Sequence, residues 1–169
     1  MVSSFHSAIS GRPSYMYWVF GAIAIGTLGS VIDHGSSLVA LPTIADHFDT
    51  DIPTVQWVVI AYTLTITALL LPMGRLSDQM GRRKVYISGS LVFIIGAALS
   101  GLSMSLGMLI ASRVIQGVGA AMTQGTGMAI IASVFPAGQR GKAIGLIMTI
   151  VGSGGIAGPA IGGLLVQAL

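Results

Sequence analysis

The sequence predicts an all-α membrane protein with five transmembrane helices, on the basis of its composition, its long apolar segments and its distribution of basic residues. Charged residues make up 8% of the chain and hydrophobic residues 53%, whereas a soluble globular chain is about 25% charged. So few charged side chains cannot cover a surface that faces water, and the surrounding medium must therefore be lipid. The chain contains no cysteine, which excludes disulfides and thiolate metal sites.

Five apolar segments are long enough to cross a hydrocarbon core about 30 Å thick, which takes about 20 helical residues. Pro42 can stop the first segment, Pro53 precedes the second and Pro136 ends the fourth, because proline cannot continue the helical hydrogen-bond pattern. The short connectors favour antiparallel neighbours. The predicted helices span approximately residues 15–41, 54–73, 85–103, 106–134 and 142–168.

The connectors predict the orientation, because cytoplasmic loops carry an excess of Lys and Arg. Connectors with basic residues alternate along the chain with connectors that have none. We therefore expect residues 1–14 to form a cytoplasmic N-terminal tail of a multi-pass protein in the plasma (inner) membrane. The net charge of +3 follows from this topology, and no nucleic-acid partner is expected. The acidic stretch DHFDTD, residues 46–51, fits a solvated loop better than a metal site.

The second connector, GRLSDQMGRRKV at residues 74–85, gathers four basic residues around one acidic residue, Asp78. The topology explains its positive charges but not the Asp. The stretch closely resembles motif A of the major facilitator superfamily, whose pattern is G-x-L-a-D-r-x-G-r-[RK]. In that family motif A lies in the cytoplasmic connector between the second and third helices, which is where the charge pattern independently places residues 74–85.

Three further stretches resemble motifs of the same family in the expected order. RVIQGVGAAM, residues 113–122, is similar to motif B, and GIAGPAIGG, residues 155–163, is similar to motif C of antiporters. VIDHGSSLVALP, residues 31–42, resembles the L-D-x-T-I-V-N-V-A-L-P motif of the fourteen-helix drug:proton antiporter branch. Here the T-I-V-N of the family is replaced by Gly-Ser-Ser-Leu at residues 35–38.

Members of this family have twelve or fourteen helices in two six-helix halves. The resemblance, which runs from about residue 16 to the end, therefore implies an N-terminal fragment: five helices of an incomplete six-helix bundle, whose partner is the missing remainder of the transporter. The family also implies a role for motif A as a conformational latch at the junction of the two halves. Asp78 would meet a helix N-terminus of the missing half and its own Arg82. The alternative is that Asp78 neutralises a neighbouring Arg in a solvated connector. The latch residues are Gly74, Asp78, Gly81, Arg82 and Arg83.

Asp33 and Arg113 are charged residues within apolar segments. At 1.5 Å per residue, Asp33 lies about 12 Å and Arg113 about 10 Å from the outer ends of their helices. An intramembrane ionisable residue is a functional hypothesis by default. The shared depth predicts an ion pair, and the resemblance places both helices around the central cavity. Burial disfavours an ionised carboxylate and a nearby guanidinium favours it, so Asp33 can take up and release protons as the cavity changes. The alternatives are a static structural pair and a counter-charge for substrate.

Two neighbours of this pair are weaker candidates. Gln116 follows Arg113 by one helical turn and can donate into the same substrate cavity, although an interhelical contact explains it equally. His34 lies beside Asp33, but adjacent helical residues point about 100° apart. We therefore expect His34 to face a neighbouring helix rather than to relay protons.

Glycines at every fourth position of the last segment form one flat face for close helix contact. Pro159 lies within this pattern and removes a backbone hydrogen bond, which predicts a kink. The resemblance to motif C implies a hinge or interface between rocking helices. A phosphate-binding glycine loop is excluded because no Lys follows it. The motif C residues are Gly154, Gly158, Pro159, Gly162 and Gly163.

Together these patterns predict a secondary transporter that exports small, drug-like compounds by proton-coupled alternating access. The expected partners are the small-molecule substrate, protons and the lipid bilayer, and no cofactor is expected. The alternatives are a superfamily uniporter or importer of another solute, and a truncated, non-transporting membrane bundle. An enzyme is not expected, because no second intramembrane carboxylate and no intramembrane His pair accompanies Asp33.

Overall fold

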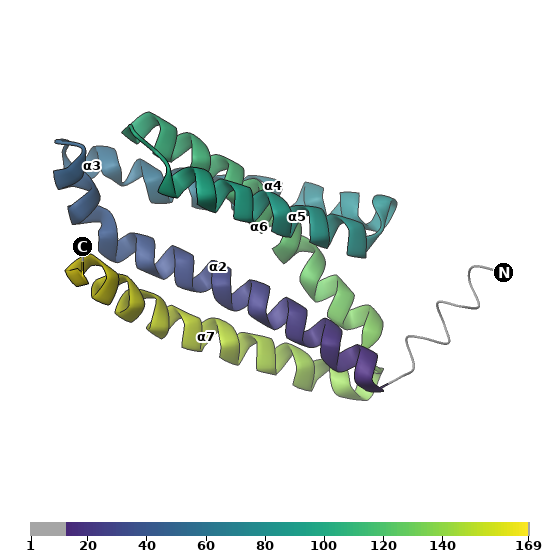
Figure 1. The fold of residues 1–169 in the computed structure, drawn as a ribbon. Helices are drawn as coiled ribbons and strands as arrows, with labels where there is room; N and C mark the ends of the chain where they lie inside the picture. The colour runs from purple at the N-terminus through teal and green to yellow at the C-terminus, as the bar shows by residue number, and fades with distance from the viewer. Residues whose placement is uncertain (1–12, 169) are drawn as a thin grey trace.

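The computed structural model describes residues 13–168, which form helices joined by short turns (Figure 1). Five of the helices are long and apolar enough to cross a membrane, so the predicted all-α membrane fold is confirmed. Residues 1–12 of the predicted tail lie outside the described range. The elements are α2 (Pro13–His47), α3 (Ile52–Val55), α4 (Trp57–Met80), α5 (Arg82–Gly101), α6 (Leu106–Val134) and α7 (Ala137–Ala168).

The long helices form two groups, α2 with α7 and α4 with α5 and α6, which are visible as separate layers in Figure 1. Glycines permit close packing within both groups. A Cβ atom added to Gly96 of α5 would lie 2.6 Å from the backbone nitrogen of Gln116 on α6. A Cβ added to Gly125 of α6 would lie 2.9 Å from the carbonyl oxygen of Leu70 on α4. Small residues at helix interfaces are the usual means of association in lipid, where apolar burial gives little driving force.

Two apolar clusters join the groups at opposite ends of the molecule. One contains Ile23, Ile131, Phe135, Ala143 and Ile147, which come from α2, α7 and the C-terminal part of α6 with the residue after it. The other, formed by Ala45, Val55, Val58 and Leu109, lies where α2 ends and α4 and α6 begin. Between these two clusters the groups meet through polar side chains, which is where the candidate site lies.

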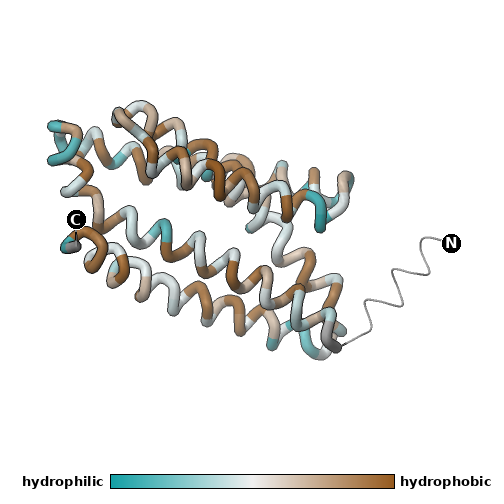
Figure 2. The backbone as a smooth tube through the Cα atoms, viewed as in Figure 1, coloured by the Kyte–Doolittle hydropathy of each residue, from teal (hydrophilic) through white to brown (hydrophobic). Residues whose placement is uncertain are grey.

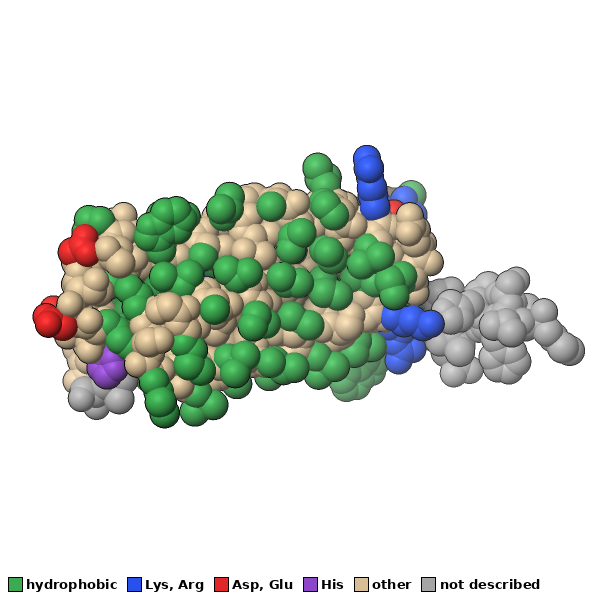
Figure 3. Space-filling model, turned by 90° about the horizontal axis from the view of Figure 1, so that it is seen from above, with side chains coloured by type: hydrophobic (Ala, Val, Ile, Leu, Met, Phe, Trp, Pro, Cys, Tyr) green, Lys and Arg blue, Asp and Glu red, His purple; other side chains and the backbone are tan. Residues whose placement is uncertain are grey.

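The surface is apolar along the helices and charged at their ends (Figures 2 and 3). In Figure 3 most acidic side chains gather at one end, and the basic side chains gather at the other. Large apolar residues face outwards, with Ile25, Leu71 and Ile156 exposed by 74%, 78% and 80%. Gln116 and Thr126, by contrast, are completely buried. This distribution is typical of a protein whose solvent is the bilayer.

Several helix boundaries differ from those predicted. Pro42 does not stop the first helix, because α2 continues through it to His47. A proline inside a helix removes its own backbone hydrogen bond and its ring crowds the carbonyl one turn earlier. Ala45 beyond it is buried in the apolar cluster around Val55, so packing outweighs that cost. Residues 74–80, expected to belong to a connector, continue α4 as far as Met80. Only Gly81 then separates α4 from α5, and α7 begins at Ala137 rather than near residue 142.

Candidate functional site

Asp33 of α2 and Arg113 of α6 form an ion pair between the two helix groups. Arg113 Nη1 lies 2.8 Å from Asp33 Oδ2. The Arg113 side chain is 11% exposed and that of Asp33 27%. The structure therefore brings together two residues that are 80 positions apart, as their common depth predicted. Their role in proton movement stays a prediction.

Two neutral side chains complete the contacts of the Arg113 guanidinium. Its Nη1 also donates to Gln116 Oε1 at 3.0 Å, and its Nη2 donates to Ser37 Oγ at 2.6 Å. The Ser37 hydroxyl in turn donates to the Asp33 carbonyl at 2.7 Å. Within residues 13–168, three buried side-chain polar atoms have no partner, and two of them, Arg113 Nε and Gln116 Nε2, belong to this site. A charged donor with several acceptors at one depth is a fixed polar centre in an apolar surrounding.

Of the two neutral partners of Arg113, the sequence predicted Gln116 but not Ser37. Gln116, expected to line the substrate cavity, is fully buried, and its backbone packs against Gly96 of α5. It reaches the site through its bond to Arg113. Ser37 was not predicted. The available signal was that residues 35–38 depart from the family pattern and place a hydroxyl one helical turn after Asp33.

His34 faces a neighbouring helix, as expected from its position next to Asp33. Its ring stacks on that of Tyr62 of α4, with ring centroids 5.7 Å apart and an interplanar angle of 27°. Tyr62 is 3% exposed. This stack is a second polar connection between the two helix groups, beside the ion pair.

The glycine face of α7 lies against α2 around Asp33. A Cβ added to Gly158 would lie 3.1 Å from the Gly35 Cα, and one added to Gly162 would lie 2.7 Å from the Ser36 Cα. The Ser36 hydroxyl donates to the Gly158 carbonyl at 2.9 Å. Gly154 belongs to the same face, whereas a Cβ at Gly163 would meet no atom closer than 4.0 Å. Four of the five predicted motif C residues, including Pro159, therefore form or adjoin the α2 contact.

At the basic end, Asp78 contacts Arg82 as the sequence predicted. Arg82 Nη2 lies 2.9 Å from Asp78 Oδ1, and Arg82 Nη1 donates to the Ala129 carbonyl of α6 at 2.8 Å. Gly81 between the two helices has a φ of 100°, which favours glycine. Gly74 packs beside Gly125 of α6. The side chain of Arg83 is exposed.

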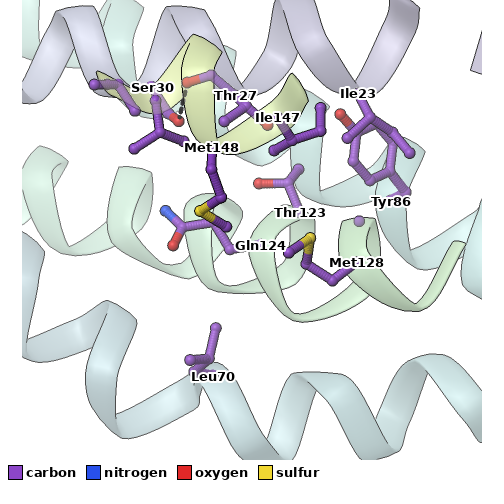
Figure 4. A pocket seen from close by; sticks show the side chains of 13 residues that line it. Ile23, Thr27, Ser30, Leu70, Tyr86, Thr123, Gln124, Met128, Ile147 and Met148 are labelled. Carbon is purple, nitrogen blue, oxygen red and sulfur yellow. Dashed lines mark hydrogen bonds between the residues drawn. The ribbon is translucent and has the colours of Figure 1, made fainter. Parts of the chain in front are cut away.

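A cavity of about 280 Å³ lies between the two helix groups (Figure 4). Its polar lining residues are Thr27, Ser30, Tyr86, Thr123 and Gln124, and the remaining ones are mostly aliphatic or Met. Asp, Glu, Lys, Arg and His do not line it. The sequence did not predict this cavity, because its lining comes from all five long helices. Among the described residues, no group of three or more His, Cys, Asp and Glu side chains is arranged to hold a metal ion.

The sequence of this chain is similar to those of known membrane transporters. A family described as the Major Facilitator Superfamily matches residues 23–169. The chain is 41% identical over 145 residues to the riboflavin transporter RibZ of Clostridioides difficile, which covers 86% of this chain and 32% of that protein. It is 33% identical to the tetracenomycin C resistance and export protein of Streptomyces glaucescens, covering 95% of this chain and 29% of the relative.

A similar structure has also been solved. The crystal structure of a bacterial homologue of the human lysosomal transporter Spinster, in an inward-facing and unoccupied conformation, matches with a TM-score of 0.78 and 25% identity. The match covers 92% of this chain and 33% of that one. The chain thus spans about a third of the length of the curated relatives that it matches.

Proposed function

The chain belongs to the major facilitator superfamily, and we propose that it is part of a secondary transporter that exports small, drug-like molecules in exchange for protons. The protein is an integral multi-pass membrane protein. In this proposal its N-terminus lies in the cytoplasm, because the basic ends of the helices would face that side. The remainder of the transporter would supply the opposite wall of the substrate pathway by alternating access.

The ion pair between Asp33 and Arg113 is the observation that carries this proposal. The pair lies at the boundary of two helix groups, is partly buried and joins helices far apart in sequence. An acid in such a place takes up a proton more readily when the guanidinium moves away, and releases it more readily when water or the guanidinium stabilises the carboxylate. Arg113 keeps its charge throughout, so the pair can alternate between an ion pair and a neutral acid beside a cation. Proton uptake by Asp33 would then favour one orientation of the transporter.

The contacts around motif A and motif C support the conformational part of the proposal. Arg82, the first residue of α5 after the turn at Gly81, links this turn to α6 through its hydrogen bond to the Ala129 carbonyl. The glycine face of α7 allows α2 and α7 to slide in close contact. We propose that Gly74, Asp78, Gly81, Arg82 and Arg83 act as a latch against the remainder of the transporter, and that the α2–α7 contact transmits movement from Asp33.

The cavity between the helix groups supports a neutral, amphipathic substrate. Gln124 is exposed in the cavity wall, and its side chain makes no hydrogen bond within residues 13–168, so its amide is available to a ligand (Figure 4). Met128 and Met148 provide adaptable apolar contacts. The lining has no charged side chain that would compensate a charged compound. Gln124 follows Arg113 by 11 positions on α6, so substrate would bind about 16 Å along the helix from the ion pair.

The test uses the full-length protein that contains this chain, reconstituted in liposomes with an imposed pH gradient. Riboflavin and tetracenomycin C serve as substrates, because relatives carry these compounds in their names. We expect Asp33→Asn to reduce gradient-driven transport to the rate of empty liposomes. Asp46→Asn, the same substitution at an exposed position of α2, should leave transport unchanged. Normal transport by the Asp33→Asn variant would overturn the coupling role, and transport of neither compound would overturn the substrate assignment.

The second candidate is a uniporter or importer of the same superfamily. One observation favours it: the relative with 41% identity is named as a transporter of riboflavin without a stated direction. The two candidates differ in driving force. An exporter should accelerate when protons flow in the opposite direction to substrate, whereas a uniporter should respond only to the substrate gradient. The same liposomes, measured with and without the pH gradient, separate them.

A further inference from the structure

Ser37 and Ser112 are two buried serines that flank Arg113 and differ in one contact. Ser37 of α2 is 6% exposed and Ser112 of α6 is 2% exposed. Each hydroxyl donates to a carbonyl of its own helix at 2.7 Å, Ser37 to Asp33 and Ser112 to Leu109. Ser37 Oγ additionally accepts a hydrogen bond from Arg113 Nη2. Ser112 is therefore a matched control for Ser37, because only Ser37 is hydrogen-bonded to the guanidinium.

The bond from Ser37 determines how Arg113 meets Asp33. A guanidinium can bind a carboxylate through two parallel hydrogen bonds, which is its strongest arrangement. Here only Nη1 reaches the carboxylate, at Oδ2, because Nη2 is held by Ser37. The Ser37 hydrogen points to the Asp33 carbonyl, so its oxygen presents lone pairs to the guanidinium. Ser37 thus competes with the Asp33 carboxylate for the Nη2 donor of Arg113.

We propose that Ser37 is a positioning residue that limits the ion pair to one hydrogen bond between Arg113 and the Asp33 carboxylate. Ser37 thereby eases protonation of Asp33 during transport. The inference rests on the proposed proton coupling. When Asp33 becomes neutral, Arg113 retains two neutral acceptors, Ser37 Oγ and Gln116 Oε1. The cation is then not left without partners, which would be costly in an apolar surrounding. Removal of the Ser37 oxygen would free Nη2 for the carboxylate and strengthen the pair.

The titratable groups that face Asp33 are few. Arg113 approaches from α6, Tyr62 approaches from α4, and His34 on α2 itself stacks on Tyr62. The α7 segment against this part of α2, residues 150–165, contains no titratable side chain, and neither does the α5 segment that packs behind Gln116, residues 89–101. Because His34 and Tyr62 also lie beside the pair, a change in the pH dependence of transport is assigned to Asp33 by a carboxylic-acid signal that Asp33→Asn removes.

The experiment compares Ser37→Ala with Ser112→Ala in the full-length protein, with riboflavin transport measured across a range of outside pH. In Ser37→Ala the freed Nη2 should donate a second hydrogen bond to the Asp33 carboxylate. This gain should move the midpoint of the pH profile to lower pH by about one unit, or roughly tenfold in proton concentration. Ser112→Ala should keep the midpoint of the wild type. Ser37→Thr, which restores a hydroxyl, should return the midpoint towards the wild-type value. An unchanged or raised midpoint in Ser37→Ala would overturn the inference.

An independent readout covers the case in which a variant transports poorly. Infrared difference spectra of the purified protein detect the carbonyl band of a protonated carboxylic acid as pH is lowered. We expect a band that is absent in Asp33→Asn and that appears at lower pH in Ser37→Ala than in the wild type. If Asp33→Asn loses pH-dependent transport while Ser37→Ala titrates as the wild type, only the role of Ser37 fails. If Asp33→Asn keeps the full pH dependence, the proposed coupling fails, and the inference fails with it.

Discussion

Two Asp–Arg pairs in this chain have nearly the same separation but very different surroundings. Asp78 and Arg82 are four residues apart across Gly81, with a contact of 2.9 Å and side chains 61% and 38% exposed. Asp33 and Arg113 are 80 residues apart on two helices, with a contact of 2.8 Å and side chains 27% and 11% exposed. Interatomic distance does not distinguish the pairs, whereas burial and the identity of the joined elements do.

The difference in burial determines how much each ion pair contributes to stability. An exposed ion pair contributes about 0–1 kcal/mol to stability, because water and salt screen it. Loss of one partner from a buried pair costs about 3–5 kcal/mol, because the other charge is left uncompensated. The pair at Asp78 is therefore suited to local geometry and to contacts that form and break. The pair at Asp33 holds two helix groups together and has a large effect when it is neutralised.

The largest expected effect comes from removal of Arg113 from the buried pair, with removal of Asp78 from the exposed pair as the comparison. Arg113→Ala should lower the free energy of unfolding by about 3 kcal/mol, the lower end of the range for buried pairs because Asp33 keeps some exposure. Asp78→Ala should lower it by about 1 kcal/mol or less. Reversible unfolding in mixed detergent micelles measures both. Equal losses in the two variants would show that burial does not separate the pairs.

A smaller effect is expected from the helix contact that supports only the buried pair. Gly162→Ala places a methyl group against the Ser36 backbone and should cost about 1–3 kcal/mol, as for other overpacked interiors. Gly163→Ala meets no close atom and should be neutral, so it is the matched control. The thermal unfolding temperatures of both variants check this. A similar decrease for both would mean that α7 does not contact α2 through this face.

Among the glycine substitutions, the smaller effect is expected at the turn that supports the exposed pair. Gly81→Ala forces a side chain onto a residue with φ of 100° and should cost about 1–2 kcal/mol. Because Asp78 and Arg82 lie on either side of this turn, their contact should also weaken, while the pH dependence of transport should not change. The readouts are the unfolding temperature and the pH profile. A shifted profile would show that the two pairs are coupled.

The sequence was sufficient for the features that depend on helix geometry and on the cost of charge in lipid. The five spans, the pairing of Asp33 with Arg113 and the glycine face of α7 all follow from a fixed rise, a fixed periodicity and the need for a counter-charge. The end of α2 was mispredicted because a local rule about Pro42 was outweighed by burial of Ala45. Ser37, Tyr62 and the cavity could not be predicted, because they depend on how each helix is rotated against partners far away in sequence.

The division into two helix groups has a consequence for biosynthesis. The helices that cover α2, namely α6 and α7, are translated after α4 and α5. At about 5–20 residues per second, the 80 positions between Asp33 and Arg113 correspond to roughly 4–16 s of ribosome time. For that interval a nascent chain carries an acidic residue within α2 without its counter-charge. The insertion machinery must therefore shelter α2, or let it wait near the bilayer surface, until α6 emerges.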